Sequence, residues 1–379
     1  MKTVYLDYAA ATPLDTKVQA AMRPYFDNQF FNPSATYSAA RTVHTDIEAA
    51  RSSIAALLGA RSSEIIFTAG GTEANNLAVH GIMQRYPDKK VIVSNIEHES
   101  VLAPAHQYDN IEAPVRNDGL IDVSALTGLI DDETVLVSVI YANNEVGTIQ
   151  PLREIATVIR NVLNNRRNTS NHLPLYFHSD AAQAANYLDL HVSRLGLDMM
   201  SLNGGKIHGP KQSGLLWIRS GIELKPLFQG GGQERNVRSG TENVPGIIGL
   251  SVALEMAQAK KTEESVRTRA LQQLFIELIK KKIPGSIVNG SLKKRLPNNV
   301  HITILGQDNE RLLFGLDEAG IQAAAGSACS ASSDKPSHVL RAMGISDADA
   351  RSSLRFTLGR STTQSSIRQT VDALARLIA

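Results

Sequence analysis

Four short apolar segments of this chain each run into a cluster of polar residues whose side chains can move protons or bind anions. In an open α/β sheet, ligands bind beyond the carboxyl ends of the strands. If the four segments are neighbouring strands, their polar clusters therefore meet in one crevice. The clusters are 68–73 after Phe67, 97–99 after Val93, 143–145 after Ile140, and 178–183 after Phe177.

The first cluster contains the turn Gly70-Gly71-Thr72, which is predicted to open a helix. Backbone N–H groups at a helix start, together with the Thr72 hydroxyl, suit a phosphate group. A Gly-Gly turn is also common without any ligand, so both interpretations stay open. The G-x-G-x-x-G spacing of a dinucleotide-binding loop is missing, which argues against a dinucleotide.

Asp180 and His98 each allow a structural and a functional interpretation. Asp180 directly follows a buried strand and is either a helix cap or the carboxylate partner of a pyridinium nitrogen. His98 is either a satisfied polar side chain or a catalyst. With Glu97 it suggests a metal pair, but no second histidine stands at ligand spacing, so we expect no metal.

A lysine on a glycine-rich turn, Lys206, follows the strand-like segment 198–202. Such a lysine is often simply exposed, or it is held where it can form a Schiff base with a carbonyl cofactor. Lys211 is the rival candidate, but it follows Pro210 and we expect it to point away.

Cys329 is the one cysteine among 379 residues, which excludes an internal disulfide and a cysteine-based zinc site. Structural cysteines usually lie among larger apolar side chains, whereas this one is surrounded by Gly326, Ser327, Ser330 and Ser332. A reactive thiol and an inert loop residue are both compatible with such a local sequence.

The elements that must position these residues alternate between strand-like and helix-like segments. This alternation predicts an α/β fold with a mostly parallel sheet between helices. The asparagine-rich stretch 161–171 is predicted to be an exposed loop. The strands are predicted at 64–67, 90–93, 135–140, 175–177 and 198–202, and the helices at 74–85, 152–163, 245–258 and, capped by Thr262, at 263–282.

The length is sufficient for two domains. We expect a large domain over 15–261 and a smaller α+β domain that combines 1–14 with 262–379 and carries the cysteine loop. The formal net charge of +2, from 39 basic and 37 acidic residues, gives no electrostatic case for nucleic-acid or membrane binding. Neither an apolar signal segment nor a run of transmembrane length is present, so we expect a cytoplasmic protein.

Ten motifs occur in order along nearly the whole chain: 5–13 (YLDYAAATP), 67–76 (FTAGGTEANN), 97–98 (EH), 143–147 (NNEVG), 180–183 (DAAQ), 206–211 (KIHGPK), 230–235 (GGGQER), 238–243 (RSGTEN), 326–329 (GSAC) and 355–360 (RFTLGR). Each alone is modestly specific, whereas ten in order are highly specific. Together they resemble the pyridoxal-phosphate-dependent cysteine desulfurases of the NifS/IscS class, a class V aminotransferase-like family.

The resemblance implies a homodimer with the fold type I architecture of pyridoxal-phosphate enzymes. It implies that Lys206 holds the cofactor as a Schiff base and that His98 stacks on the cofactor ring and helps to move protons. Asp180 would pair with the pyridinium nitrogen and keep the ring an electron sink. The other implied cofactor contacts are Gly71, Thr72, Asn144, Gln183, Asn203 and, from the partner subunit, Thr241.

The resemblance also implies the reaction, which converts L-cysteine to L-alanine. Arg355 would clamp the substrate carboxylate with its planar fork, and Asn32 and Asn144 would complete the substrate site. The Cys329 thiolate would take up the sulfur as a persulfide for a protein acceptor. An iron–sulfur scaffold, a tRNA-thiolating enzyme and a relay protein are all open as that acceptor.

Two rival functions remain at this stage. One is another fold type I enzyme, such as a selenocysteine lyase or an aminotransferase, although Cys329 argues against the latter because transamination needs no thiol. The other is a non-catalytic dimeric scaffold. The chain also departs from the family pattern. It has Asn203-Gly204-Gly205 where Ser-Gly-His is usual and Tyr37 where histidine is common, so the phosphate side of the site is altered.

Overall fold

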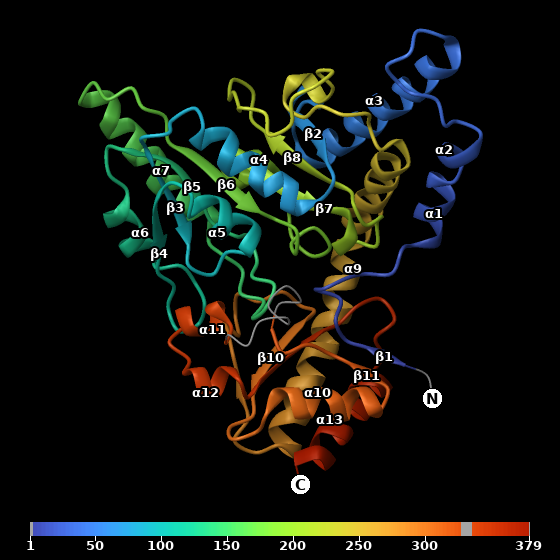
Figure 1. The fold of residues 1–379 in the computed structure, drawn as a ribbon. Coiled ribbons are helices and arrows are strands. Elements are labelled where there is room, and N and C mark those ends of the chain that lie inside the picture. The colour runs from blue at the N-terminus through green and yellow to red at the C-terminus, as the bar shows by residue number, and fades with distance from the viewer. Residues whose placement is uncertain (1–2, 327–335, 379) are drawn as a thin grey trace.

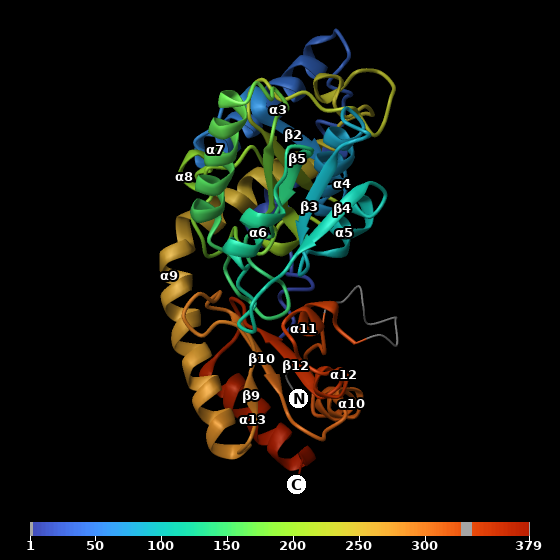
Figure 2. The ribbon, with the colours of Figure 1, turned by 90° about the vertical axis from the view of Figure 1, so that its left-hand side faces the viewer.

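The computed structural model describes residues 3–326 and 336–378, so Cys329 lies outside the described residues. Two bodies of structure lie one above the other, and the long helix α9 (Val244–Lys282) runs from one into the other (Figures 1 and 2). The upper body contains the larger sheet, and the lower body contains both chain ends described here.

The large sheet has seven strands in the order β2-β8-β7-β6-β5-β3-β4. Every neighbouring pair from β4 through β3, β5 and β6 to β7 is parallel, whereas β8 runs antiparallel to both β7 and β2. Six carboxyl ends therefore lie at one edge. The strands are β2 (Ile65–Thr68), β3 (Lys90–Ser94), β4 (Asp109–Ala113), β5 (Thr134–Ser138), β6 (Tyr176–Asp180), β7 (Met199–Asn203) and β8 (Gly214–Ile218).

Helices cover both faces of this sheet, because successive residues of each buried strand point to opposite sides. In β2, Ile65 and Phe67 join one apolar cluster and Ile66 joins the other. The fold is thus the predicted α/β sandwich. One face is covered by α3 (Ser38–Leu58), α7 (Leu152–Asn168) and the first part of α9, and the other by α4 (Gly71–Met83) and α5 (Glu99–Ala105).

The lower body has a third apolar cluster, which joins Val4 and Leu6 from the start of the chain to Phe275 of α9 and Phe356. Its strand order is β12-β10-β9 in one sheet and β1-β11 in a second. The strands are β1 (Val4–Tyr5), β9 (Ile287–Val288), β10 (Asn299–Thr303), β11 (Ile321–Gln322) and β12 (Ser353–Thr357), packed against α10 (Asn309–Glu318) and α13 (Gln364–Ile378).

Residues 245–258 and 263–282 are helical as predicted, but the predicted break between them is wrong. The helices expected at 245–258 and 263–282 are one helix, α9, whose cap is Asn243 and not Thr262; the Asn243 side chain accepts from the backbone N–H of Gly246. The stretch around Thr262 is polar because α9 is largely exposed between the two bodies, and it contains no helix breaker. The expected loop at 161–171 is mostly helix, since α7 continues to Asn168.

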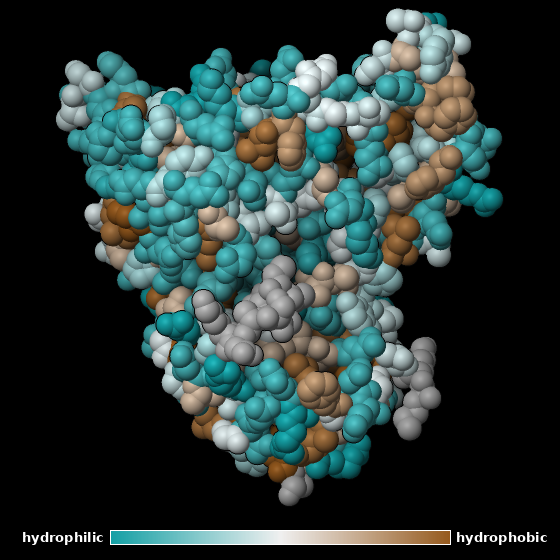
Figure 3. Space-filling view, viewed as in Figure 1, coloured by the Kyte–Doolittle hydropathy of each residue, from teal (hydrophilic) through white to brown (hydrophobic). Residues whose placement is uncertain are grey.

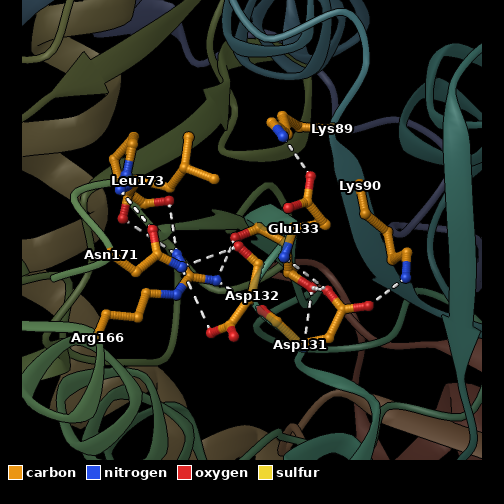
Figure 4. Close-up of polar contacts among 10 residues, drawn as sticks. Lys89, Lys90, Asp131, Asp132, Glu133, Arg166, Asn171 and Leu173 are labelled. Atoms are coloured by element: carbon orange, nitrogen blue, oxygen red, sulfur yellow. Dashed lines mark hydrogen bonds and ion pairs between the residues drawn. The ribbon is translucent and has the colours of Figure 1, made fainter. Parts of the chain in front are cut away.

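The edge where the parallel strands begin is closed by a buried arginine (Figure 4). The guanidinium of Arg166 donates to four backbone carbonyls: those of Asp131 and Thr134 at 2.7 Å, of Pro174 at 3.0 Å and of Leu173 at 3.2 Å. Beside it, Lys89 pairs with Glu133 and Lys90 pairs with Asp131. These contacts join the starts of β3, β5 and β6 to the end of α7.

The helices of residues 3–326 and 336–378 include none with both the length and the apolar character that crossing a bilayer requires.

Candidate active site

The four polar clusters meet at the carboxyl edge of the large sheet, as predicted, around two adjoining cavities. The smaller cavity, of about 70 Å³, is lined by residues that follow β2, β3, β5, β6 and β7 and by Arg355 of β12. The larger, of about 500 Å³, opens toward the start of α4. Gly71, Thr72, Asn203 and Lys206 line both cavities, which therefore adjoin at these residues.

The start of α4 faces this space and is built for close approach. Gly70 caps the helix with a φ of 151°, a backbone conformation that favours glycine. A Cβ on Gly214 would lie 2.6 Å from the Gly70 carbonyl carbon, so β8 and this turn pack backbone against backbone. Gly71 and Thr72 form the first turn of the 13-residue helix, whose leading N–H groups suit an anion.

Lys206 ends a short 3₁₀ turn that follows β7. The Asn203 side chain holds the turn by accepting from the Gly205 N–H at 2.9 Å. Lys206 Nζ donates to the Ala10 carbonyl at 2.6 Å, which keeps the ammonium at the junction of the two cavities. The expectation that Lys211 points away is wrong. It lines the larger cavity, and its Nζ donates to the Thr12 carbonyl at 2.5 Å.

Asp180 ends β6 and is 6% exposed. Its Oδ1 accepts from the Ala182 N–H at 2.8 Å, and its Oδ2 accepts from Asn75 Nδ2 at 2.7 Å. His98 is the N-cap of α5, where its Nδ1 accepts from the Ser100 N–H at 3.1 Å. Sequence reasoning missed Asn75 and Ser100, although both lie next to residues it selected and both line the smaller cavity.

Glu97 lies fully buried behind His98. Its Oε1 accepts from Ser94 Oγ and from the Ile140 N–H, each at 2.5 Å, and so ties the end of β3 to the segment after β5. Burial raises the pKa of Glu97 to about 8, against hydrogen bonds from Ser94 and Ile140 that lower it. Among the residues that the structure describes, no cation pairs with this side chain, which is consistent with a protonated, uncharged Glu97 at neutral pH.

Arg355 is 1% exposed and lines the smaller cavity from the side of β12. It pairs with Asp7 Oδ1 at 2.7 Å and donates to the Asn144 carbonyl at 3.1 Å, while its buried Nε has no hydrogen-bond partner among residues 3–326 and 336–378. Gln183 lines the same cavity and donates from Nε2 to the Ala9 carbonyl at 3.0 Å. The first residues of the chain were not predicted to form part of the site.

Two residues from the resemblance lie apart from the cavities of their own chain. Asn32 is exposed in the loop between α2 (Pro24–Asp27) and α3, where its Oδ1 accepts from the Ser34 N–H at 2.9 Å. Thr241 is exposed just before α9. Neither lines either cavity. Within the described part of the chain, no three His, Cys, Asp or Glu residues gather as metal ligands would.

Residues 4–370 match the aminotransferase class-V family. The chain is 40% identical to a cysteine desulfurase IscS of Dictyoglomus turgidum, over all of this chain and 95% of that protein. It is also 40% identical to a cysteine desulfurase IscS of Methanosarcina thermophila, over 100% and 92% of the two chains. A NifS-like protein from Rickettsia africae has a similar structure, with a TM-score of 0.88, 32% identity and 99% of both chains covered. The chain therefore belongs to the aminotransferase class-V family, as one of its pyridoxal-phosphate-dependent cysteine desulfurases.

Proposed function

We propose that the two cavities bind pyridoxal phosphate and L-cysteine together, with Lys206, Asp180 and the start of α4 holding the cofactor. The observation that supports this most strongly is that an ammonium, a buried carboxylate and a helix N-terminus line the same cavity. These groups match an aldehyde, a pyridine nitrogen and a phosphate, which are the three recognisable parts of the cofactor.

The donor set fits the cofactor on its own chemistry. Gly71 and Thr72 present N–H groups and a hydroxyl at the phosphate end, with Asn203 beside them. Asp180 already accepts two hydrogen bonds, which orient its carboxylate toward the cavity where a protonated ring nitrogen would lie. His98, Asn144 and Gln183 line the smaller cavity, where the ring and the substrate would lie.

Bound pyridoxal phosphate supplies an electron sink that weakens the bonds next to the α-carbon of an amino acid. Lys206 Nζ holds the proton that must move beside that carbon, and its contact with the Ala10 carbonyl keeps it there. Arg355 meets the substrate carboxylate. Its guanidinium is already oriented by Asp7 and Asn144, and its buried Nε has no partner among the residues that the structure describes. Planar bidentate recognition of a carboxylate is the task to which arginine is best suited.

The described residues on either side of the stretch that carries Cys329 contact residues of the candidate site or residues next to them. On one side, the backbone of Ala324 pairs with that of Arg355, with N···O distances of 3.2 and 2.6 Å. On the other side, Ser337 Oγ donates to Glu145 at 2.5 Å and His338 Nε2 donates to the Glu97 carbonyl at 2.9 Å. This placement supports Cys329 as the sulfur acceptor within the chain.

The sulfur transfer balances without an oxidant. The Cys329 thiolate attacks the substrate sulfur, an S–S bond forms, and the Cβ–S bond breaks with its electron pair left on Cβ. That carbon then takes up a proton, so L-cysteine leaves as L-alanine and Cys329 carries a persulfide. The persulfide passes to a sulfur-acceptor protein, and the proposed setting of this exchange is the cytoplasm.

Cys329→Ser tests the proposal directly. The variant should still bind the cofactor and still change its absorption spectrum when cysteine is added. It should release alanine far more slowly than the wild type, because a hydroxyl is a poor nucleophile toward sulfur. Intact mass of the wild type after a short incubation with cysteine should show one added sulfur. Undiminished alanine release by Cys329→Ser would overturn the assigned role.

We further propose that the active unit is a homodimer in which Thr241 reaches the partner's phosphate site. Large apolar side chains are exposed near α2 and on the 228–241 segment, and Figure 3 shows apolar residues on the surface at the upper right. Phe30 stacks on Phe31 at 4.6 Å, and Tyr37 packs edge-on at 5.9 Å from Phe31. The exposed side chains are Phe26, Phe30, Tyr37 and Phe228.

Subunit mixing tests the crossing of Thr241. Lys206→Ala and Thr241→Val should each be impaired alone. In a mixed dimer, the subunit that retains Lys206 receives an intact Thr241 from its partner, so mixing should restore one working site and raise alanine release. If Thr241 acts within its own chain, no intact site can form and mixing should restore nothing. Sedimentation of each variant controls for dimer formation.

A further inference from the structure

A continuous line of hydrogen bonds joins Asp180 to His98 through two side chains to which the reaction above gives no role. Asn75 Nδ2 donates to Asp180 Oδ2 at 2.7 Å and to Ser100 Oγ at 2.8 Å. Ser100 Oγ lies 2.7 Å from His98 Nδ1. Asn75 is 1% exposed and Ser100 is 7% exposed, so both side chains are buried.

The protein fixes the direction of each bond in this line. A carboxylate only accepts, so the nitrogen of the Asn75 amide, and not its oxygen, must face Asp180. That nitrogen has two hydrogens, and the second points to Ser100 Oγ. Ser100 Oγ is therefore an acceptor toward Asn75, and its single proton is left for the other close partner, His98 Nδ1.

His98 Nδ1 receives a second donor from the backbone. The Ser100 N–H points to the same nitrogen at 3.1 Å, in the usual geometry of a helix N-cap. A ring nitrogen that accepts two hydrogen bonds has no proton of its own. In a neutral imidazole the proton must then lie on Nε2.

We propose that Ser100 and Asn75 are positioning residues that hold His98 as the neutral tautomer with its proton on Nε2. His98 thus presents a donor at Nε2 to the bound molecule, and Nε2 in this tautomer does not take up a proton released by the substrate. Asn75 sets both ends of the line, because the same amide orients the carboxylate of Asp180. The tautomer rests on the hydrogen bonds alone; its use in catalysis rests on the function proposed above.

The test is ¹⁵N NMR of the ring nitrogens in protein labelled at histidine, both without and with pyridoxal phosphate. The chain has ten histidines, so the His98 signals are assigned as those lost in His98→Gln. We expect a protonated Nε2 and an unprotonated Nδ1 for His98. Ser100→Ala should move the Nδ1 signal and raise the fraction of the other tautomer, whereas Ser100→Thr, which keeps the hydroxyl, should restore the wild-type signals.

Ser138→Ala is a matched control, because Ser138 Oγ lies 2.8 Å from the ring of a different buried histidine, His178. It should shift the signals of His178 and leave those of His98 in place. A proton on Nδ1 of His98 in the wild type overturns the proposal, and unchanged His98 signals in a folded Ser100→Ala variant overturn the part played by Ser100. If the tautomer is as expected but His98→Gln turns over normally, the catalytic role of His98 fails while the tautomer stands.

Discussion

Two buried arginines lie at opposite edges of the large sheet and differ in how many of their hydrogen-bond donors the protein already uses. Arg166, at the edge where the strands begin, spends its terminal nitrogens on four backbone carbonyls (Figure 4). Arg355, where the strands end, uses one carbonyl and one carboxylate and faces a cavity. Backbone groups close the first edge, whereas side chains line the second and stay available for a ligand, in agreement with the general placement of sites in α/β sheets.

The largest expected effect is at Lys206, the cation of the open edge. Lys206→Ala should abolish alanine release, and borohydride should no longer attach the cofactor covalently to the protein. Peptide mapping of the reduced wild-type protein locates the attachment. Attachment at Lys211, which lines the larger cavity together with Lys206, would show that Lys211 and not Lys206 binds the cofactor covalently.

The next largest effects are expected at the two arginines: a loss of activity at Arg355 and a loss of stability at Arg166. Arg355→Met should lower kcat/KM by about ten- to a hundredfold, because a charge-assisted hydrogen bond is worth roughly 1.5–3 kcal/mol. Arg166→Met should leave kcat/KM within about threefold in the folded fraction. It should lower the free energy of unfolding by at least about 2 kcal/mol, since buried carbonyls lose their donors.

Steady-state kinetics and urea denaturation measure both variants. Arg355→Lys is the matched control: it keeps the charge but loses the planar fork, and it should fall between the wild type and Arg355→Met. The contrast between the edges fails if Arg166→Met loses activity at full stability, or if Arg355→Met loses only stability.

The sequence was sufficient for the strands and for the convergence of their polar clusters. Strands of a mostly parallel sheet are buried on both faces, so they appear as short apolar runs that end where β2, β3 and β6 end in the structure, within three residues. The sequence was not sufficient to predict that Asn75 and Ser100 belong to the site. These residues are 25 positions apart, and their bond exists only because the starts of α4 and α5 pack together in the folded chain. The sequence also did not show where the Lys211 side chain points. Its flexible four-carbon stem lets the ammonium reach the Thr12 carbonyl, and the position of Pro210 in the sequence does not determine this.

Glu97 gives a smaller, pH-dependent effect. Its pKa is about 8 in the folded protein, against an ordinary value of 4.5. Between these values the folded state binds the proton and the unfolded state does not, so stability falls as pH rises. Glu97→Gln keeps an oxygen for Ser94 and Ile140 and has no proton to lose. As the pH rises from about 4.5 to 8, the wild type should therefore lose stability relative to the variant. The difference between their free energies of unfolding should grow by up to a few kcal/mol, at about 1.4 kcal/mol per pKa unit. If urea denaturation gives a difference in free energy of unfolding between the two proteins that does not change with pH, the raised pKa is contradicted.

The smallest effect concerns Gly205, where the family pattern has histidine. A Cβ at this position would lie 3.4 Å from Asn203 Oδ1 and 3.8 Å from Lys211 Cγ, and Gly205 does not have a positive φ. The backbone therefore accepts a side chain, and Gly205→His adds a donor near the phosphate end. A new charge-assisted hydrogen bond is worth about 1.5 kcal/mol at its lower limit, or about tenfold in affinity. We expect retention of pyridoxal phosphate on dialysis to improve by up to that factor, with Gly205→Ala as the control that adds a Cβ and no donor.

Lys211 decides how the result of the Gly205 experiment is understood. Its stem passes beside Gly205, and the residue lines the cavity that contains the start of α4. If Gly205→His and Gly205→Ala retain the cofactor equally, an existing cation has already taken the place of the histidine. Lys211→Gln should then weaken retention of the cofactor by about tenfold, the gain that the histidine failed to add. The reason is that the substitution removes a positive charge that would pair with the doubly charged phosphate. If neither Gly205→His nor Lys211→Gln changes retention in well-folded protein, the phosphate depends on the N–H groups of α4 alone, and the altered side of the site contributes nothing to cofactor affinity.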